Sequence, residues 1–477
     1  MPPPPGPPRW RAIVGIVAVS AVVLGLVAIA TKVLGGDSGP DHPDQWDARV
    51  LHIANFVETE RGLRFEQPVY VDFLSPSEYT ATSTDDDASL TRDDREELDH
   101  FAGELRALGV GSGEIDLFEV YNQVSDAGTL AFYDPATERI AVRGTEMTVG
   151  LEVTLAHELT HALQDQHFDL DRIQQDTRDS SAAVAFRALA EGDALRVEQG
   201  YQTSELTEAE QTAYDDEYQR EIDASEAATE DVPAFVSATF GAPYALGQPF
   251  AVMLDNQGGN AAVDDAFNEP PTTEESIFDP ASFLAGEGSE ALELGFDAEA
   301  KLLDTGPFGS PTWYLVLAER IDPKVAFEAV LGWNGDEHAT FEKDGRTCIR
   351  AGFIGDEPSD EAEMRAAIDL WVEAMPGGQA ESREIDGHPG IQACDPGEDI
   401  DMELTGRSDA SLHLPSLWGF LVADASSQLE ADGTRCYARR IIDGLTYEQI
   451  IDPEGTAFAG SDFQASLVDA FRACQDA

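Results

Sequence analysis

The stretch AHELTHALQDQHFDL, residues 156–170, constrains the fold more than any other part of the sequence. His157 and His161 are four positions apart, so on a helix they are separated by about 40° around the axis and about 6 Å along it. Both imidazoles can then reach one metal ion, as in many helical zinc sites. A row of leucines falls on the opposite side of this helix and can be buried: Leu151, Leu155, Leu159 and Leu163. The stretch therefore predicts a helix with one face in the core and the other lining a metal site.

Two histidines leave such a site incomplete, and the sequence offers two residues to complete it. The spacing matches H-E-x-x-H-x-x-G-x-x-H, except that Gln164 stands where a glycine would let the chain leave the helix. On a continuing helix, His167 would lie about 15 Å along the axis from His157, too far to reach the same ion. Glu191 shares a helical stripe with apolar residues, where an ionised carboxylate needs a partner such as zinc. We therefore expect His157, His161 and Glu191 as ligands, with His167 as the alternative.

The neighbours of Glu191 support its assignment as a ligand. Gly192 would let this helix approach another closely, because glycine has no side chain. Asp193 could orient a ligand histidine through a hydrogen bond from outside the ligand set. The alternative is that Glu191 is a buried structural carboxylate, paired with Arg187 or Arg196.

Two further residues are candidates for catalysis. Glu158 is next to a ligand but turned away from it, so it can take a proton from a water molecule that the zinc activates. A hydrolytic site also gains from a hydrogen-bond donor to the developing oxyanion. We expect Tyr244, in the glycine-bounded segment GAPYALG, to be this donor, the alternative being a tyrosine of the core.

The motif resembles that of the zincin metallopeptidases, and a third ligand from a later glutamate resembles their gluzincin type. The resemblance implies Zn²⁺ as cofactor and a peptide or protein substrate. Roughly residues 110–345 also resemble a family of uncharacterised bacterial membrane-anchored proteins that are predicted to be such peptidases. The segments that carry this resemblance are YDPATERIAVRG, LAHELTHALQDQHFDL, ALAEGDA, PYALGQPFAVMLDNQGGNAAVDDAFNEPP and GWNGDEHATF.

The resemblance also implies an edge strand ahead of the metal helix, which pairs with an extended substrate. Residues 139–144 occupy the corresponding place in the order of elements, and a purely structural hairpin is the alternative. The chain departs from the family after the segment that contains PPTTEE. We expect a His-Pro pair there, but Phe278, Asp279 and Pro280 stand in its place.

The N-terminus contains an uncharged apolar run, residues 12–30, preceded by two arginines. Roughly 19 residues suffice for a helix to cross a bilayer, and the positive-inside rule places the rest of the chain outside the cytoplasm. We expect a cytoplasmic tail at 1–11, a transmembrane helix at 12–34 and a linker at 35–47. The small residues Ala28 and Ala30 around Ile29 allow the alternative of a cleaved signal peptide.

Composition fits an exported protein. The chain has 92 acidic and 29 basic residues, for a net charge of −63, which disfavours binding to nucleic acid and indicates adaptation to high salt. The four cysteines predict two disulfides outside the cytoplasm, with three possible pairings. All of them lie in the last third of the chain: Cys348, Cys394, Cys436 and Cys474.

Hydrophobic periodicity indicates an α+β fold. A hairpin is expected within TLAFYDPATERIAVRG just before the metal helix, and short helices are expected in the Gly/Pro-punctuated residues 240–280. We expect a zincin-like catalytic domain at 48–320 and a mixed α/β domain, braced by disulfides, at 321–477.

These expectations combine into an exported, single-pass membrane zinc metallopeptidase with most of the chain extracytoplasmic. Two alternatives stay open at this point. One is a catalytically inactive zincin-like ectodomain that keeps its metal for structure and binds an envelope partner. The other is a metzincin-like peptidase that uses His167 as the third ligand.

Overall fold

The computed structural model describes residues 41–477, apart from 85–89, 128–129, 171–172, 174–180, 296–299, 453–454, 459 and 476–477. The expected tail at 1–11, the transmembrane helix at 12–34 and the first part of the linker at 35–47 lie outside the described residues. Within the described part of the chain, every helix is too short or too polar to cross a membrane.

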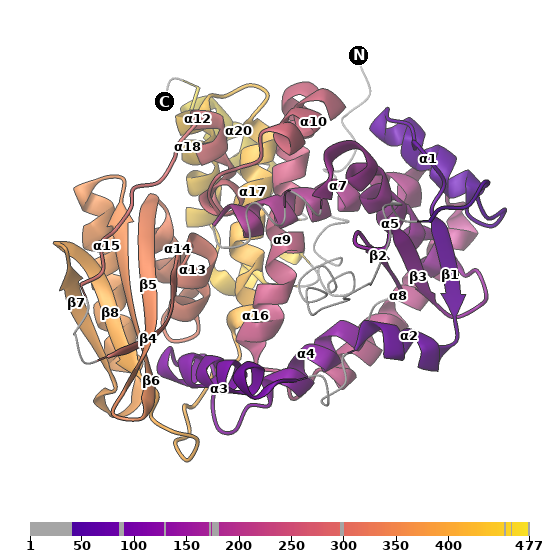
Figure 1. The fold of residues 1–477 in the computed structure, drawn as a ribbon. Helices are drawn as coiled ribbons and strands as arrows, with labels where there is room; N and C mark the ends of the chain where they lie inside the picture. The colour runs from indigo at the N-terminus through magenta and orange to yellow at the C-terminus, as the bar shows by residue number, and fades with distance from the viewer. Residues whose placement is uncertain are drawn as a thin grey trace.

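The fold is α+β, as expected, with two sheets at opposite ends of the molecule and helices between them (Figure 1). The smaller sheet has the order β1-β3-β2, formed by Tyr70–Leu74, Arg139–Arg143 and Ala131–Asp134. The larger sheet has the order β4-β5-β6-β8-β7. Its strands are Lys301–Gly306, Trp333–Lys343, Arg346–Gly355, His388–Cys394 and Ala380–Ile385.

The hairpin of β2 and β3 is confirmed, but its position in the sheet differs from the expected one. β3 pairs in parallel with β1 on one side and antiparallel with β2 on the other. The expectation that residues 139–144 form an edge strand is therefore wrong, because the backbone groups of β3 are used on both sides. The outer strand next to the histidine helix is β2.

The histidine helix, α5, spans Val149–Phe168. It begins where the Thr148 side chain accepts a hydrogen bond from the Leu151 N–H at 3.2 Å, and it ends at Asp169, whose φ of 59° is left-handed. The expected leucine stripe is fully buried. The helix therefore continues past Gln164, as expected for a chain without the glycine turn.

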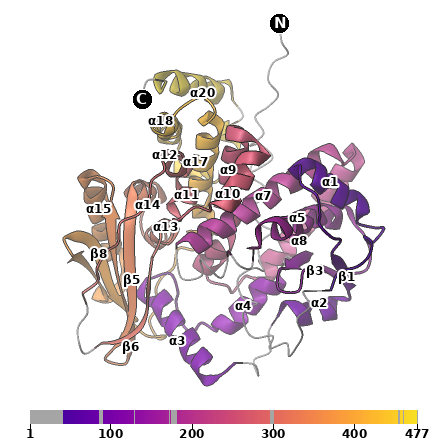
Figure 2. The same cartoon turned by 45° about the horizontal axis from the view of Figure 1, so that its top comes forward.

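Helix α9, Ala234–Gly258, is longer than the sequence indicates. Glycines and prolines predicted short helices here, yet one helix of 25 residues contains both Pro243 and Pro249. Each proline lacks the N–H that would continue the helix ladder. Most of α9 is nevertheless buried, packed between α7 (Ala182–Ser204) and α17 (His413–Ala425) (Figures 1 and 2). Tertiary burial thus outweighs the local signals for a break.

The helices α7 and α9 cross with their backbones in contact. A Cβ built on Gly192 of α7 would lie 2.0 Å from the carbonyl oxygen of Gly247 on α9, and one on Gly247 would lie 1.9 Å from the Ala188 carbonyl oxygen. Only glycine fits at either position. The close approach expected for Gly192 is therefore present.

Two disulfides form among the described residues, as expected. Cys348–Cys394 joins β6 to β8, and Cys436–Cys474 joins α18 (Ala431–Asp443) to α20 (Ser461–Ala473). One hydrophobic core extends from Ala102 to Cys474. The domain boundary at 320/321 stays a prediction, and this shared core runs across it.

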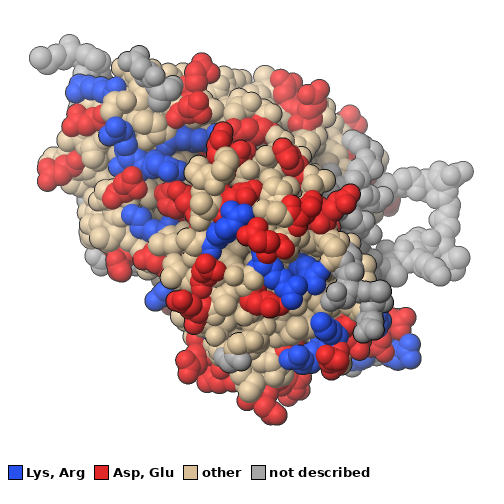
Figure 3. Space-filling view, turned by 90° about the vertical axis from the view of Figure 1, so that its left-hand side faces the viewer, with Lys and Arg blue, Asp and Glu red and all other residues tan. Residues whose placement is uncertain are grey.

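The remaining elements are all helices. These are α1 Leu51–Arg61, α2 Pro76–Ser83, α3 Arg92–Ala107, α4 Leu117–Asp126, α8 Glu208–Ala228, α10 Asn260–Asn268, α11 Glu275–Phe278, α12 Pro280–Ala285, α13 Ser310–Ala318, α14 Pro323–Val330, α15 Pro358–Ala374, α16 Ser408–Ser411, α19 Tyr447–Ile450 and the 3₁₀ helices η3 Pro376–Gly378 and η4 Thr456–Phe458. On the side that carries the larger sheet, basic side chains are interspersed with acidic ones (Figure 3).

We expect Gly192→Ala to destabilise the fold by about 1–3 kcal/mol or more, because the added methyl group would meet the Gly247 backbone. Thermal or urea unfolding of the full chain measures this. Gly200→Ala is the matched control on the same helix, where the new Cβ would meet the flexible end of Glu60 at 3.2 Å and the Phe56 ring at an ordinary contact distance of 3.5 Å. A control that loses as much stability as Gly192→Ala would contradict the backbone-contact explanation.

Candidate metal centre

Three side chains from two helices converge on one point. His157 and His161 come from α5, and Glu191 comes from α7. The two Nε2 atoms are 3.0 Å apart, and each lies 3.2 Å from Glu191 Oε2. All three side chains are buried. The structure thus brings together the three residues that the sequence singled out as ligands.

The outer nitrogens of both rings are already engaged. His157 Nδ1 lies 2.9 Å from Glu198 Oε2, and His161 Nδ1 lies 3.0 Å from Gln164 Oε1. Both partners are acceptors, so each Nδ1 donates a proton to its partner and each Nε2 is directed toward Glu191. Two Nε2 atoms and a carboxylate oxygen this close together need a proton or a metal cation between them. The donor set therefore fits a bound metal ion.

The spacing of these atoms also fits zinc. In a tetrahedral site with Zn–N distances of about 2.0–2.1 Å, neighbouring ligand atoms lie about 3.3 Å apart. The three separations of 3.0, 3.2 and 3.2 Å are close to this value. Two imidazoles and one carboxylate, with a fourth position open, are the ligands of a typical catalytic zinc site.

A series of buried polar side chains orients the His161 ring through its Nδ1 atom. Gln164 Nε2 donates to Asp193 Oδ2 at 2.9 Å and to the Ala190 carbonyl at 3.1 Å, which fixes its amide oxygen toward His161. Asp193 in turn accepts hydrogen bonds from Arg61 at 2.8 Å and Arg196 at 3.0 Å. Asp193 therefore contacts the histidine through Gln164 and not directly.

Glu158 is also buried, and its carboxylate is held by the smaller sheet. Glu158 Oε2 accepts a hydrogen bond of 2.8 Å from the Tyr133 N–H. Tyr133 belongs to β2, the outer strand, so this N–H lies on the edge that β3 does not occupy. The contact places the expected catalytic base between the candidate metal ligands and the outer edge of β2.

Tyr244 and Arg187 lie beside the ligands. The ring of Tyr244 stacks on that of His157 at 6.4 Å between centroids, with 22° between the ring planes. Arg187 Nε is 3.9 Å from Glu191 Oε1, which is longer than a hydrogen bond. Arg196 pairs with Asp193 and Asp255, not with Glu191. A simple structural ion pair thus accounts poorly for Glu191.

Burial and mutual contacts set the ionisation of the site. Burial disfavours charge on Glu191, yet His161 and His157 together lower the pKa of its carboxyl below the usual range. Burial likewise opposes charge on His157, but its bonds to Glu191 and Glu198 outweigh it and raise the His157 pKa. Burial raises the pKa of Glu158 and that of Tyr244. Glu191 is therefore ionised, and Tyr244 keeps its hydroxyl proton.

His167 is far from this centre. It occupies the last turn of α5, where its Nε2 lies 2.8 Å from the carbonyl oxygen of Arg64, and the contact is exposed. Because the helix continues to Phe168, the side chain stays three turns from His157. Arg64 accounts for the position of His167 without a metal ion.

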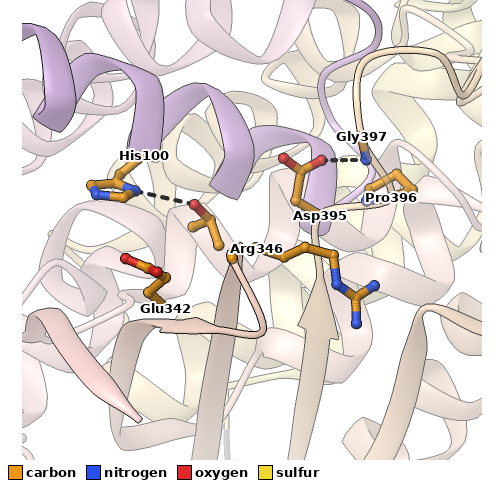
Figure 4. Close-up of a pocket in the computed structure, with 8 residues that line it drawn as sticks. His100, Glu342, Arg346, Asp395, Pro396 and Gly397 are labelled. Carbon is orange, nitrogen blue, oxygen red and sulfur yellow. Dashed lines mark hydrogen bonds between the residues drawn. The ribbon is translucent and has the colours of Figure 1, made fainter.

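A pocket of about 410 Å³ lies elsewhere, between α3 and the ends of strands in the larger sheet (Figure 4). His100 Nδ1 is 3.3 Å from Thr347 Oγ1 there. The pocket's Asp395 accepts two hydrogen bonds, of 2.9 and 2.8 Å, from Arg106 of α3. These charges join a helix to a sheet, and none of the pocket's lining residues belongs to the metal centre.

Two residues of the site were missed in the sequence. Glu198 follows Glu191 by seven positions, two turns along the same face of α7, and this spacing was the signal that could have identified it. Gln164 was considered only as a residue that replaces a glycine. Its position three residues after His161 places it on the same face of α5, where it orients that ring.

We expect Gln164→Leu to lower zinc affinity by roughly 10- to 100-fold, because His161 loses the acceptor that fixes its tautomer. Competition with a chromophoric chelator measures the affinity. Gln166→Leu is the matched control on the same helix, since Gln166 bonds only to the backbone around Gln67. Equal affinities for Gln164→Leu and wild type would show that this hydrogen bond does not support the site.

Comparisons with protein-family models, with curated proteins and with solved structures found no match for this chain. The side chains of the candidate metal centre are therefore the basis for a function. His157, His161 and Glu191 converge on one point, and Glu158 lies beside them.

Proposed function

We propose that the protein is a zinc-dependent peptidase of the gluzincin type, with a zincin-like catalytic part. One observation carries the proposal: two imidazole Nε2 atoms, whose Nδ1 atoms are both held by acceptors, face one buried carboxylate next to a second buried glutamate. The oriented Nδ1 atoms argue for a site organised around a cation. The second glutamate argues for hydrolysis in addition to a structural role.

The chemistry divides among five side chains. His157, His161 and Glu191 would hold a zinc ion, which would supply the Lewis acidity that polarises the substrate carbonyl and makes the attacking water more acidic. Glu158 takes the proton of this water and passes it to the leaving amine. The Tyr133 N–H orients Glu158 through one carboxylate oxygen, so the other oxygen handles the proton. Tyr244, which keeps its proton, donates a hydrogen bond to the developing oxyanion.

We place an extended peptide or protein substrate along β2. This strand lies against α5 and has one edge that no strand of the described chain occupies, whereas β3 has none. An added strand would pair its backbone with the groups of this edge other than the Tyr133 N–H, which Glu158 occupies, and side-chain pockets would give specificity. The expected substrate-binding strand thus moves from residues 139–144 to Ala131–Asp134.

We extend the proposal to the protein's location. The apolar run at 12–30 favours export and retention by a membrane anchor, with the peptidase outside the cytoplasm. A net charge of −63 favours work in high salt and argues against nucleic acid as a partner.

The decisive variant is Glu158→Gln in the full chain. We expect hydrolysis of a peptide library, assayed in high salt, to fall by about 10²- to 10⁴-fold, because the proton acceptor is lost. Zinc content should stay that of wild type, since Glu158 is not a ligand. Glu152→Gln, an acidic residue of the same helix that is not buried, is the control and should keep full activity.

Two outcomes would refute this mechanism. Hydrolysis that survives Glu158→Gln would mean that another group takes the proton. A wild-type protein that holds zinc but cleaves no peptide would favour the inactive ectodomain with an envelope partner.

The third ligand is tested separately by zinc titration. We expect Glu191→Ala to lose high-affinity binding, because two histidines alone remain. His167→Ala should bind as wild type does, since its ring contacts the Arg64 backbone and the Phe168 ring, away from the metal centre. The reverse pattern would make the protein a divergent metzincin.

A further inference from the structure

A second group of acidic side chains gathers where α11, the end of α12 and the turn after β6 meet. Glu275 begins α11, Glu287 follows α12, and Asp356 follows β6. One carboxylate oxygen from each lies within 4.8 Å of those of the other two. None of these residues belongs to the candidate metal centre.

Glu275 is the unusual member of this group. Its side chain is buried, with 3% of the residue exposed, and its Oε1 has no hydrogen-bond partner among the described residues. A buried carboxylate oxygen without a donor is costly, because it loses its water and gains nothing in exchange. The Glu275 side chain is directed toward Glu287 and Asp356, since one of its carboxylate oxygens lies within 4.8 Å of an oxygen of each.

Nearby positive charge does not balance the group. Arg435 donates to Asp279 Oδ2 at 2.6 Å, and to the two oxygens of Glu287 at 2.9 and 2.5 Å. Four carboxylates, those of Glu275, Asp279, Glu287 and Asp356, thus share one guanidinium, which leaves three negative charges uncompensated. Burial, followed by repulsion from Asp279, raises the pKa of Glu275 to about 9. The group must therefore take up a proton or a cation.

We propose that Glu275, Glu287 and Asp356 bind a calcium ion. Carboxylate oxygens are hard ligands, which Ca²⁺ prefers. A softer metal prefers the nitrogen ligands of the candidate metal centre. With Ca–O distances of 2.3–2.6 Å, opposite ligands of calcium lie up to about 5 Å apart, and the group fits within this span. The smaller Mg²⁺ would need its ligands closer together.

Such an ion would join distant parts of the chain. It would link α11 and α12 to the turn after β6 in the larger sheet, across the expected boundary at 320/321. α11 also packs against α7 and α9, which carry Glu191 and Tyr244. Just before α11, the Glu274 N–H donates to Ser181 Oγ at 2.8 Å, at the start of α7. Calcium would thus stabilise α7 and α9, the helices that carry Glu191 and Tyr244, through their contacts with α11.

Calcium titration of the full-length, zinc-loaded chain tests this site. High KCl masks unspecific binding by the acidic surface. We expect saturable binding and a rise of the Tm by roughly 3 °C at a calcium concentration near 100 Kd. Glu275→Gln keeps the shape of the side chain but removes its charge. We expect it to lower calcium affinity roughly tenfold or more and to abolish the rise of the Tm.

The control is Glu221→Gln on α8. Glu221 is also a glutamate with a raised pKa, of about 7, but it is only partly buried. This control should bind calcium as wild type does. A wild-type Tm that calcium leaves unchanged, with Glu275→Gln at least as stable, would mean that Glu275 carries a proton instead and would overturn the proposal. If Glu275→Gln does not fold, Asp356→Asn provides the same comparison, and unchanged calcium affinity there would overturn it equally.

Discussion

The contact between Gly192 and Gly247 is the constraint on which the rest of the site depends. Two helices can approach this closely only where neither carries a side chain, because any Cβ would overlap a carbonyl oxygen of the other. The crossing fixes α7 relative to α9. One turn of α7 then presents Glu191 to the histidines, and one turn of α9 presents Tyr244 to His157. An arrangement of side chains from three helices, α5, α7 and α9, thus depends on the absence of side chains at Gly192 and Gly247.

The sequence predicted what a single helix determines. His157, His161 and the leucine stripe follow from helical spacing alone, and Glu191 follows from the cost of an unpaired charge on an apolar face. The same reasoning, carried one step further along α7, would have found Glu198. The role of Gln164 was missed because the motif has a glycine at this position, and Gln164 was considered only as its replacement. Its contact with the His161 ring was not considered.

What the sequence could not predict is set by distant partners. The parallel pairing of Tyr70 with Arg139 makes β3 an inner strand, and no local pattern in residues 139–144 records that neighbour. α9 is similar, since Pro243 and Pro249 signal a break locally but lie in a helix that is buried on several sides. Local propensity decides where packing is weak, and tertiary contacts override it where packing is strong.

The shared core has a consequence for how the chain reaches its native state. Arg106 of α3 pairs with Asp395, 289 positions later, and α3 packs on β6. The N-terminal half therefore cannot complete its own packing while the C-terminal half is still being synthesised or translocated, since contacts so distant in sequence form late. Under the proposed export, the chain would have to cross the membrane before its fold is complete. Repulsion among its many acidic side chains would keep the segments that have not yet folded apart and soluble until folding is complete.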